Sequence, residues 1–207
     1  MMNKALGPVW HCTHQRQGII PPGLRGLDRE ATWSYSKSDG WVYGYGSFCL
    51  VSHRPVVLGA FKAMRNSAHE AKRLWLETGH LKGVVKTVIM DSKADDQALF
   101  FEFRRQRGMT LLTWPRRNSD HTARRRAMIR LLNRPRSRRL YKERAQTVEP
   151  MQGLVKEIVG LERCWMRGHR NNRWLFAAMG VAVQLHQAQA LKGHRSTWKI
   201  KQEVLGL

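Results

Sequence analysis

Two acidic residues in this sequence occupy positions at which a carboxylate can take part in chemistry, and the first is Asp91. It follows the stretch VVKTVIM (residues 84–90), whose apolar and β-branched residues predict a buried strand. Acids at the carboxyl end of a central strand are well placed to hold a metal ion. The alternative is that Asp91 only caps the loop after the strand, as short polar side chains do.

The second acid is Glu149, in the stretch RAQTVEPMQGLVK (residues 144–156). We expect Thr147 to be the N-cap of a helix, with Glu149 and Pro150 in its first turn, where the missing N–H of proline costs little. The helix dipole favours a carboxylate there. Lys156 follows two turns later on nearly the same face. The alternative is a glutamate that only helps the helix to start.

Between the two acids, residues 116–140 form a basic insertion that is rich in arginine and contains no lysine. Neutralising phosphates requires accessible cationic side chains, and the guanidinium fork fits phosphate better than an ammonium does. We therefore predict nucleic-acid contacts here, with a solvated basic loop as the alternative. The arginines expected to contact DNA are Arg116, Arg117, Arg124, Arg125 and Arg126.

The elements that must position these residues follow from the hydrophobic pattern. Residues 41–52 and 55–64 predict an antiparallel hairpin, 66–78 a helix, 83–91 a strand, 95–108 a helix and 109–115 a strand, and residues 141–189 are mostly helical. Asp95 and Asp96 are expected to be first-turn acids of the 95–108 helix, and Trp165 and Trp174 to be core residues. This order predicts an α/β fold in which one mixed sheet is flanked by helices.

The charge balance of the chain indicates its class of partner. The 207 residues contain 37 Lys and Arg against 15 Asp and Glu, a net charge of +22. Such a surplus favours a polyanion, and nucleic acid is the commonest one. Three widely spaced cysteines argue against a disulfide framework. The longest apolar run, residues 174–183, is too short to cross a bilayer, so we expect a cytoplasmic protein without a membrane partner.

The stretch YKERAQTVEPMQGLVK (residues 141–156) resembles the signature of DDE transposases of the insertion-sequence-four superfamily. That signature has Tyr, two residues, Arg, a short gap, Glu, six residues and Lys, which Tyr141, Arg144, Glu149 and Lys156 match. The gap before the Glu is four residues here, where three is commoner. The stretches around residues 40–52, 84–117 and 161–187 also look like segments of these enzymes.

The resemblance implies a ribonuclease-H-like fold that binds transposon DNA and catalyses phosphodiester cleavage and strand transfer with Mg²⁺ or Mn²⁺. Asp91 and Glu149 would be the second and third acids of the catalytic triad and would bind the metal. Tyr141, Arg144 and Lys156 would hold DNA near them. DNA is therefore the expected partner, and a homodimer is left open.

One departure from the family concerns its first catalytic acid, which lies on a strand before the one that residues 40–48 resemble. The only aspartates upstream of Asp91 are Asp28 and Asp39, both in loop-like sequence, and we expect neither to be that acid. The chain thus resembles the C-terminal part of such a catalytic domain without its first strand, inactive alone. The alternative is a non-catalytic basic nucleic-acid-binding protein.

This interpretation divides the chain into three parts. Residues 1–40 are expected to be an irregular N-terminal segment. Residues 41–190 would form the ribonuclease-H-like transposase domain, which contains the basic insertion. Residues 191–207 would be a C-terminal tail.

Overall fold

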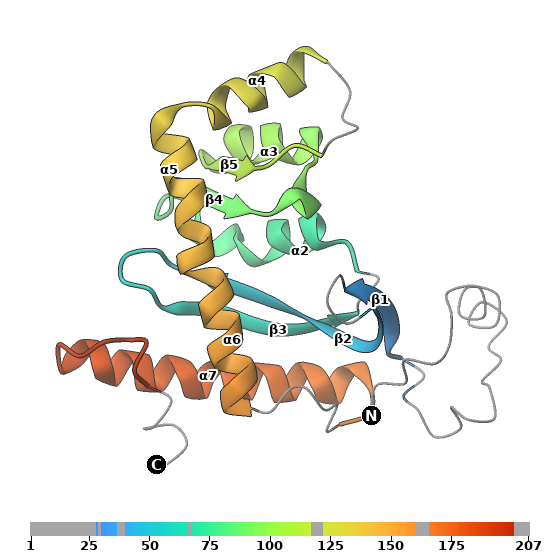
Figure 1. The fold of residues 1–207 in the computed structure, drawn as a ribbon, viewed down its shortest axis with the longest axis vertical. Helices are drawn as coiled ribbons and strands as arrows, with labels where there is room; N and C mark the ends of the chain where they lie inside the picture. Colours follow the sequence, from blue (N-terminus) through green and yellow to red (C-terminus); the bar gives the residue numbers. More distant parts are fainter. Residues whose placement is uncertain are drawn as a thin grey trace, which may run out of the picture. The chain divides into compact units, whose positions relative to one another are not determined.

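The structure is a computed structural model that describes residues 28, 30–36, 40–65, 68–116, 122–159 and 166–200. The chain divides into two compact units (Figure 1). The first unit contains residues 1–68 and 151–207, and the second contains residues 69–150. The predicted domain boundaries at residues 41 and 190 do not coincide with these units, because residues 41–190 are shared between both. Among the described residues, no helix is long and apolar enough to span a membrane.

The first unit contains a three-stranded antiparallel sheet in the order β1-β2-β3. The strands are β1 (Thr32–Ser36), β2 (Gly40–Val51) and β3 (Leu58–Arg65). The predicted hairpin is confirmed, since β2 and β3 pair from Tyr45 opposite Arg65 to Val51 opposite Leu58, with a register shift near Leu50.

Strand β1 corrects the prediction that residues 1–40 are irregular. The stretch TWSYS alternates small polar and aromatic residues, and it pairs with β2 from Thr32 opposite Gly44 to Ser36 opposite Gly40. Its partner begins at Gly40, whose φ of +71° is a conformation that favours glycine. Residues 1–27, 29 and 37–39, which include Asp39, lie outside the described residues.

Helix α7 (His169–Lys192) packs against β3 along one face (Figure 1). The rings of Phe61 and Phe176 stack with their centroids 5.0 Å apart. One turn further on, a Cβ added at Gly180 would lie 3.2 Å from the Cβ of Phe61, so glycine allows the helix to approach the strand closely. Gln187 is fully buried and accepts a hydrogen bond from the backbone N–H of Leu58 at 2.8 Å.

The core of the first unit also takes in side chains of helix α6 (Val148–Val159). Met151 and Val155 are fully buried in it, and Leu154 and Ile158 pack against it. Ile200 is fully buried in this core, and Trp198 packs against it. The described part of the predicted C-terminal tail therefore contributes apolar side chains to the core.

Two acids bind the N-terminal end of α7. The Asp28 carboxylate accepts hydrogen bonds from the Tyr45 hydroxyl at 2.7 Å and from the backbone N–H of Gly168, and the Glu30 carboxylate accepts one from the N–H of His169 at 2.6 Å. Burial raises the pKa of Asp28, but its hydrogen bonds outweigh that effect, so its pKa is lowered. Asp28 therefore stabilises a helix start, where backbone N–H groups need acceptors.

The second unit is built around a two-stranded parallel sheet, β4 (Thr87–Met90) and β5 (Thr110–Thr113). The helix between them, α3 (Gln97–Arg107), begins where the Asp96 side chain accepts the N–H of Leu99 and ends at Gly108, whose φ is +66°. This confirms the predicted strand, helix and strand, with shorter strands than expected. The other elements are α2 (Glu70–Glu77), η2 (Gly79–Leu81), η3 (Ser92–Ala94), α4 (Ala123–Leu132), α5 (Pro135–Glu143) and η4 (Arg144–Gln146).

The fold is thus mixed α/β, as predicted. The described strands, however, form two separate sheets, one antiparallel and one parallel, where the sequence predicted a single mixed sheet. The basic insertion is largely helical, since α4 and the start of α5 lie in it.

Candidate active site

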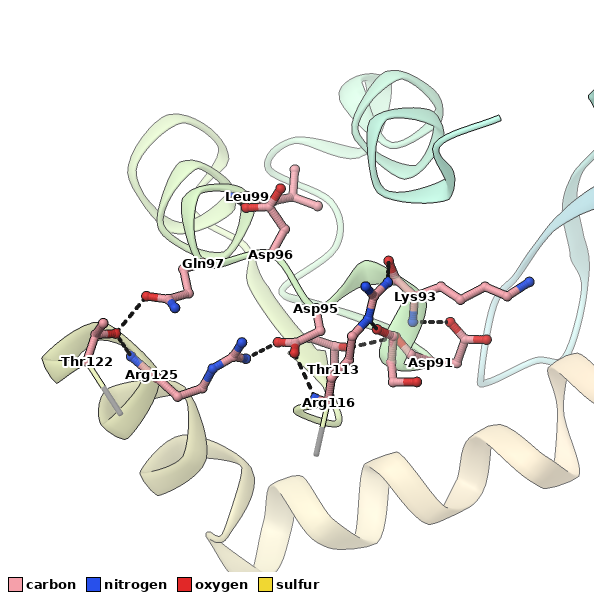
Figure 2. A network of polar contacts seen from close by, with 11 residues as sticks. Asp91, Lys93, Asp95, Asp96, Gln97, Leu99, Thr113, Arg116, Thr122 and Arg125 are labelled. Carbon is pink, nitrogen blue, oxygen red and sulfur yellow. Dashed lines mark hydrogen bonds and ion pairs between the residues drawn. The ribbon is translucent and has the colours of Figure 1, made fainter. Parts of the chain in front are cut away.

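Asp91 lies at the carboxyl ends of both strands of the parallel pair. It is the residue after β4, and its backbone carbonyl accepts a hydrogen bond from the hydroxyl of Thr113, the last residue of β5, at 2.6 Å. Its carboxylate accepts the backbone N–H of Lys93 at 2.9 Å and so caps η3 (Figure 2). Asp91 therefore caps the segment after the strand, which was the alternative interpretation from the sequence. Its carboxylate also lies at the sheet edge where ligands of α/β proteins usually bind.

Tyr141, on α5, lies within electrostatic range of Asp91. Its ring packs against that of Trp114, the residue after β5, with the centroids 5.8 Å apart. Burial raises the pKa of Tyr141, the positive charge of Arg144 lowers it, and the negative charge of Asp91 raises it, with a raised pKa as the net result. The phenol therefore stays neutral at pH 7.

Arg144 connects this pair to Glu149. Its guanidinium lies 3.1 Å from the carboxylate of Glu149 and 5.8 Å from the ring centroid of Tyr141. Glu149 is in the first turn of α6, as predicted, and its side chain is exposed. Glu149 therefore pairs with the guanidinium that neighbours Tyr141, and Asp91, far earlier in the sequence, lies within electrostatic range of the same phenol.

Thr147 is not the N-cap that the sequence predicted. Its hydroxyl donates backwards, to the carbonyls of Glu143 and Arg144, each at 3.2 Å. The reason is that α5, η4 and α6 follow one another almost without a break, so the hydroxyl serves the carbonyls at the end of the preceding helical segment.

The described residues do not form a site suited to a pair of divalent cations. They contain no group of three or more His, Cys, Asp or Glu side chains that could hold a metal ion. Asp91 and Glu149 supply two carboxylates, and Glu149 is already paired with Arg144. Mg²⁺ requires near-octahedral oxygen coordination, and two-metal chemistry relies on carboxylates that clamp both ions. Metal binding at Asp91 and Glu149 therefore stays a prediction that needs a further acid.

The predicted DNA-binding role of Arg125 is wrong. Its side chain is 7% exposed and forms an ion pair with Asp95, which is 1% exposed (Figure 2). Asp95 also accepts the backbone N–H of Arg116 at 2.8 Å. The Arg116 guanidinium donates to the carbonyls of Ser92 at 3.0 Å and Lys93 at 3.4 Å. These contacts tie both arginines to the loop that carries Asp91, because a buried carboxylate needs charged or N–H partners.

The other predicted DNA ligands differ in their placement. Arg124 and Arg126 are exposed on α4, and the Arg124 guanidinium lies 5.7 Å from the Phe101 ring. Arg117 lies outside the described residues. Lys156 is exposed on α6, in the part of that helix that belongs to the first unit.

Sequence analysis missed two residues of this site. It took Asp95 for a first-turn helix acid, whereas Asp95 precedes the N-cap of α3 and pairs with Arg125. It assigned no role to Trp114, whose ring packs against that of Tyr141 with the centroids 5.8 Å apart. Two consecutive acids, Asp95 and Asp96, precede the helix, and Asp96 alone caps it. The second acid was a signal that Asp95 has another role.

Comparison with protein-family models, with curated proteins and with solved structures finds no match to this chain.

Proposed function

We propose that this chain is a DNA-binding protein of the DDE transposase type, with the ribonuclease-H-like arrangement that its sequence resembles. One observation carries the proposal: Asp91, at the carboxyl end of β4, lies close enough to Tyr141 to raise its pKa, and Tyr141 neighbours the Arg144 guanidinium that pairs with Glu149. The motif residues Tyr141, Arg144 and Glu149 are close in the sequence. Asp91 is distant from them in the sequence, so only folding can bring it near them.

A phosphate group of DNA is the ligand that fits this pair. The Arg144 guanidinium can donate two parallel hydrogen bonds to phosphate oxygens, and the Tyr141 hydroxyl is a further donor. In the unbound protein Arg144 pairs with the exposed Glu149 carboxylate. Because exposed ion pairs contribute little, a phosphate can replace Glu149 as the partner of Arg144 at low cost.

Helices α4 and α5 supply the wider DNA-binding face. From residue 122 to residue 144 the only acid is Glu143. The exposed cations of this stretch are Arg124, Arg126, Arg130, Arg134, Arg136, Arg138, Arg139 and Lys142. A surface of this kind binds nucleic acid by releasing counterions, without regard to sequence. We name it the α4–α5 face.

DNA binding is tested by fluorescence anisotropy with a labelled duplex between 50 and 200 mM salt. In the double variant Arg124→Ala/Arg126→Ala, the slope of log K against log salt should fall by about 2, since each phosphate contact contributes about 0.9. Binding should weaken for all duplex sequences alike. The control is Arg104→Ala/Arg105→Ala, which removes two exposed arginines from α3. An unchanged slope in the first variant would overturn the proposal.

A non-catalytic nucleic-acid-binding protein is the second candidate. It is favoured by the contacts of the two acids, since Asp91 caps η3 and Glu149 pairs with Arg144. The candidates differ in cleavage of transposon-end DNA with Mg²⁺ or Mn²⁺. We expect no cleavage by this chain alone. Metal-dependent cleavage that is lost in both Asp91→Asn and Glu149→Gln would establish catalysis and exclude the second candidate.

A further inference from the structure

Helix α7 is apolar on two opposite faces. Its buried face, which packs on the sheet, carries Phe176, Gly180 and Val183. Sequence analysis predicted that Trp174 is also a core residue, but that prediction is wrong, because Trp174 is 71% exposed. Two more large apolar side chains of α7 are exposed in the same way, Val181 at 52% and Leu185 at 66%.

These exposed side chains form one stripe, which we call the outer seam. It consists of Trp174, Ala178, Val181, Leu185 and Ala188, all of which are exposed. Their spacing of four, three, four and three residues is that of the apolar seam of a coiled coil, which packs against another helix. At 1.5 Å per residue the seam is about 21 Å long. Two of the five seam residues are alanines, Ala178 and Ala188, which leave space for the side chains of a partner helix.

The charges around the outer seam indicate what kind of helix it accepts. Between Arg173 and Lys192 the helix contains no Asp, Glu, Lys or Arg. Arg170, one turn before Trp174, and Lys192, one turn after Ala188, lie at the two ends of the seam on its own face, and both are exposed.

No acid of the sequence falls between residues 163 and 202. Asp28 and Glu30, which contact the N-terminal end of α7, accept the backbone N–H groups of Gly168 and His169 and so serve the helix end. A second copy of this chain would place Arg170 and Lys192 against like charges in either orientation, which disfavours self-association.

We propose that the outer seam of α7 docks an amphipathic helix of another protein, one with an apolar heptad seam and acidic residues at both ends. The apolar seam supplies the contact area, and the acids pair with Arg170 and Lys192. The proposal uses no residue of the α4–α5 face, so it does not depend on the proposed function.

The test uses a labelled synthetic peptide of three heptads, with leucine at the seam positions and glutamate in the first and last turns. The full chain should bind it at least tenfold more tightly than two control peptides. One control has the same composition with the leucines redistributed around the helix, and the other has lysine in place of glutamate. The first control separates seam contacts from simple attraction to a basic protein.

Substitution in the seam locates the binding site. Leu185→Gln should weaken peptide binding about tenfold, because it removes one large buried apolar side chain from the contact. The matched control is Leu76→Gln, since Leu76 on α2 is 60% exposed and lies outside the seam. It should leave peptide binding unchanged. Neither variant should alter DNA binding, which keeps this result distinct from that of the proposed function.

Three results would overturn the proposal. The redistributed peptide could bind as tightly as the designed one, which would assign binding to charge alone. Leu185→Gln could bind the peptide as tightly as the unsubstituted chain. Finally, the chain could fail to bind any peptide and instead self-associate in sedimentation or bind phosphatidylserine vesicles. If Leu185→Gln abolished that behaviour, the seam would have a different partner.

Discussion

Removal of the Arg125 side chain should destabilise the second unit far more than removal of its neighbour. Arg125 and Asp95 form an ion pair that is almost fully buried, with 7% and 1% of their side chains exposed. In Arg125→Ala the Asp95 carboxylate would keep the backbone N–H of Arg116 but lose its ion pair with the guanidinium. A buried charge without a counter-ion is costly because it has lost its hydration.

The expected magnitude follows from that burial. Breaking a buried ion pair by removing one partner costs about 3–5 kcal/mol of the free energy of unfolding. Since Asp95 retains one N–H donor, we expect about 3 kcal/mol for Arg125→Ala. Arg124→Ala removes an arginine one position earlier that is exposed and only contacts the Phe101 ring. Its cost should be about 0.5–1 kcal/mol.

Urea unfolding followed by hydrogen exchange of the β4 and β5 peptides measures the stability of the second unit by itself. A double variant with Asp95→Ala should lose less than the sum of the two single variants, since no buried charge is then left unpaired. If Arg125→Ala costs no more than Arg124→Ala, the buried ion pair does not stabilise this unit, and the assignment of Arg125 to a structural role is refuted.

Three further predictions concern single side chains. Asp91→Asn should lower the pKa of Tyr141, because it removes the negative charge that raises that pKa. Ultraviolet titration measures the shift, with Tyr141→Phe as the reference. An unchanged titration would place Asp91 away from the phenol. Burial raises the pKa of the Cys49 thiol to about 12. At pH 8 its thiolate fraction and its rate of alkylation should therefore be about 10³-fold below those of an exposed cysteine. Peptide-resolved mass spectrometry measures that rate. Gly180→Val should destabilise the first unit by about 1–3 kcal/mol in denaturant unfolding, since an added Cβ would lie 3.2 Å from the Cβ of Phe61; wild-type stability would mean that α7 can move away from β3.

The local elements of this protein follow from its sequence because short-range chemistry decides them. The apolar run before Asp91 forms β4, and Asp96 and Gly108 cap α3 at its two ends. Glu149 stands in the first turn of α6 beside Pro150. Hydrophobic period, caps and turn residues act over a few positions, so they can be recognised without any knowledge of distant contacts.

The sequence alone does not show which arginines are buried and which apolar residues are exposed. Arg124, Arg125 and Arg126 are identical in type and adjacent, yet only Arg125 faces Asp95, thirty residues earlier in the chain. Trp174 is large and apolar, as core residues usually are. It is nevertheless exposed, because β3 covers only the opposite face of α7. Charge and hydrophobicity belong to single residues, whereas burial depends on which elements pack together, and only the tertiary structure decides that.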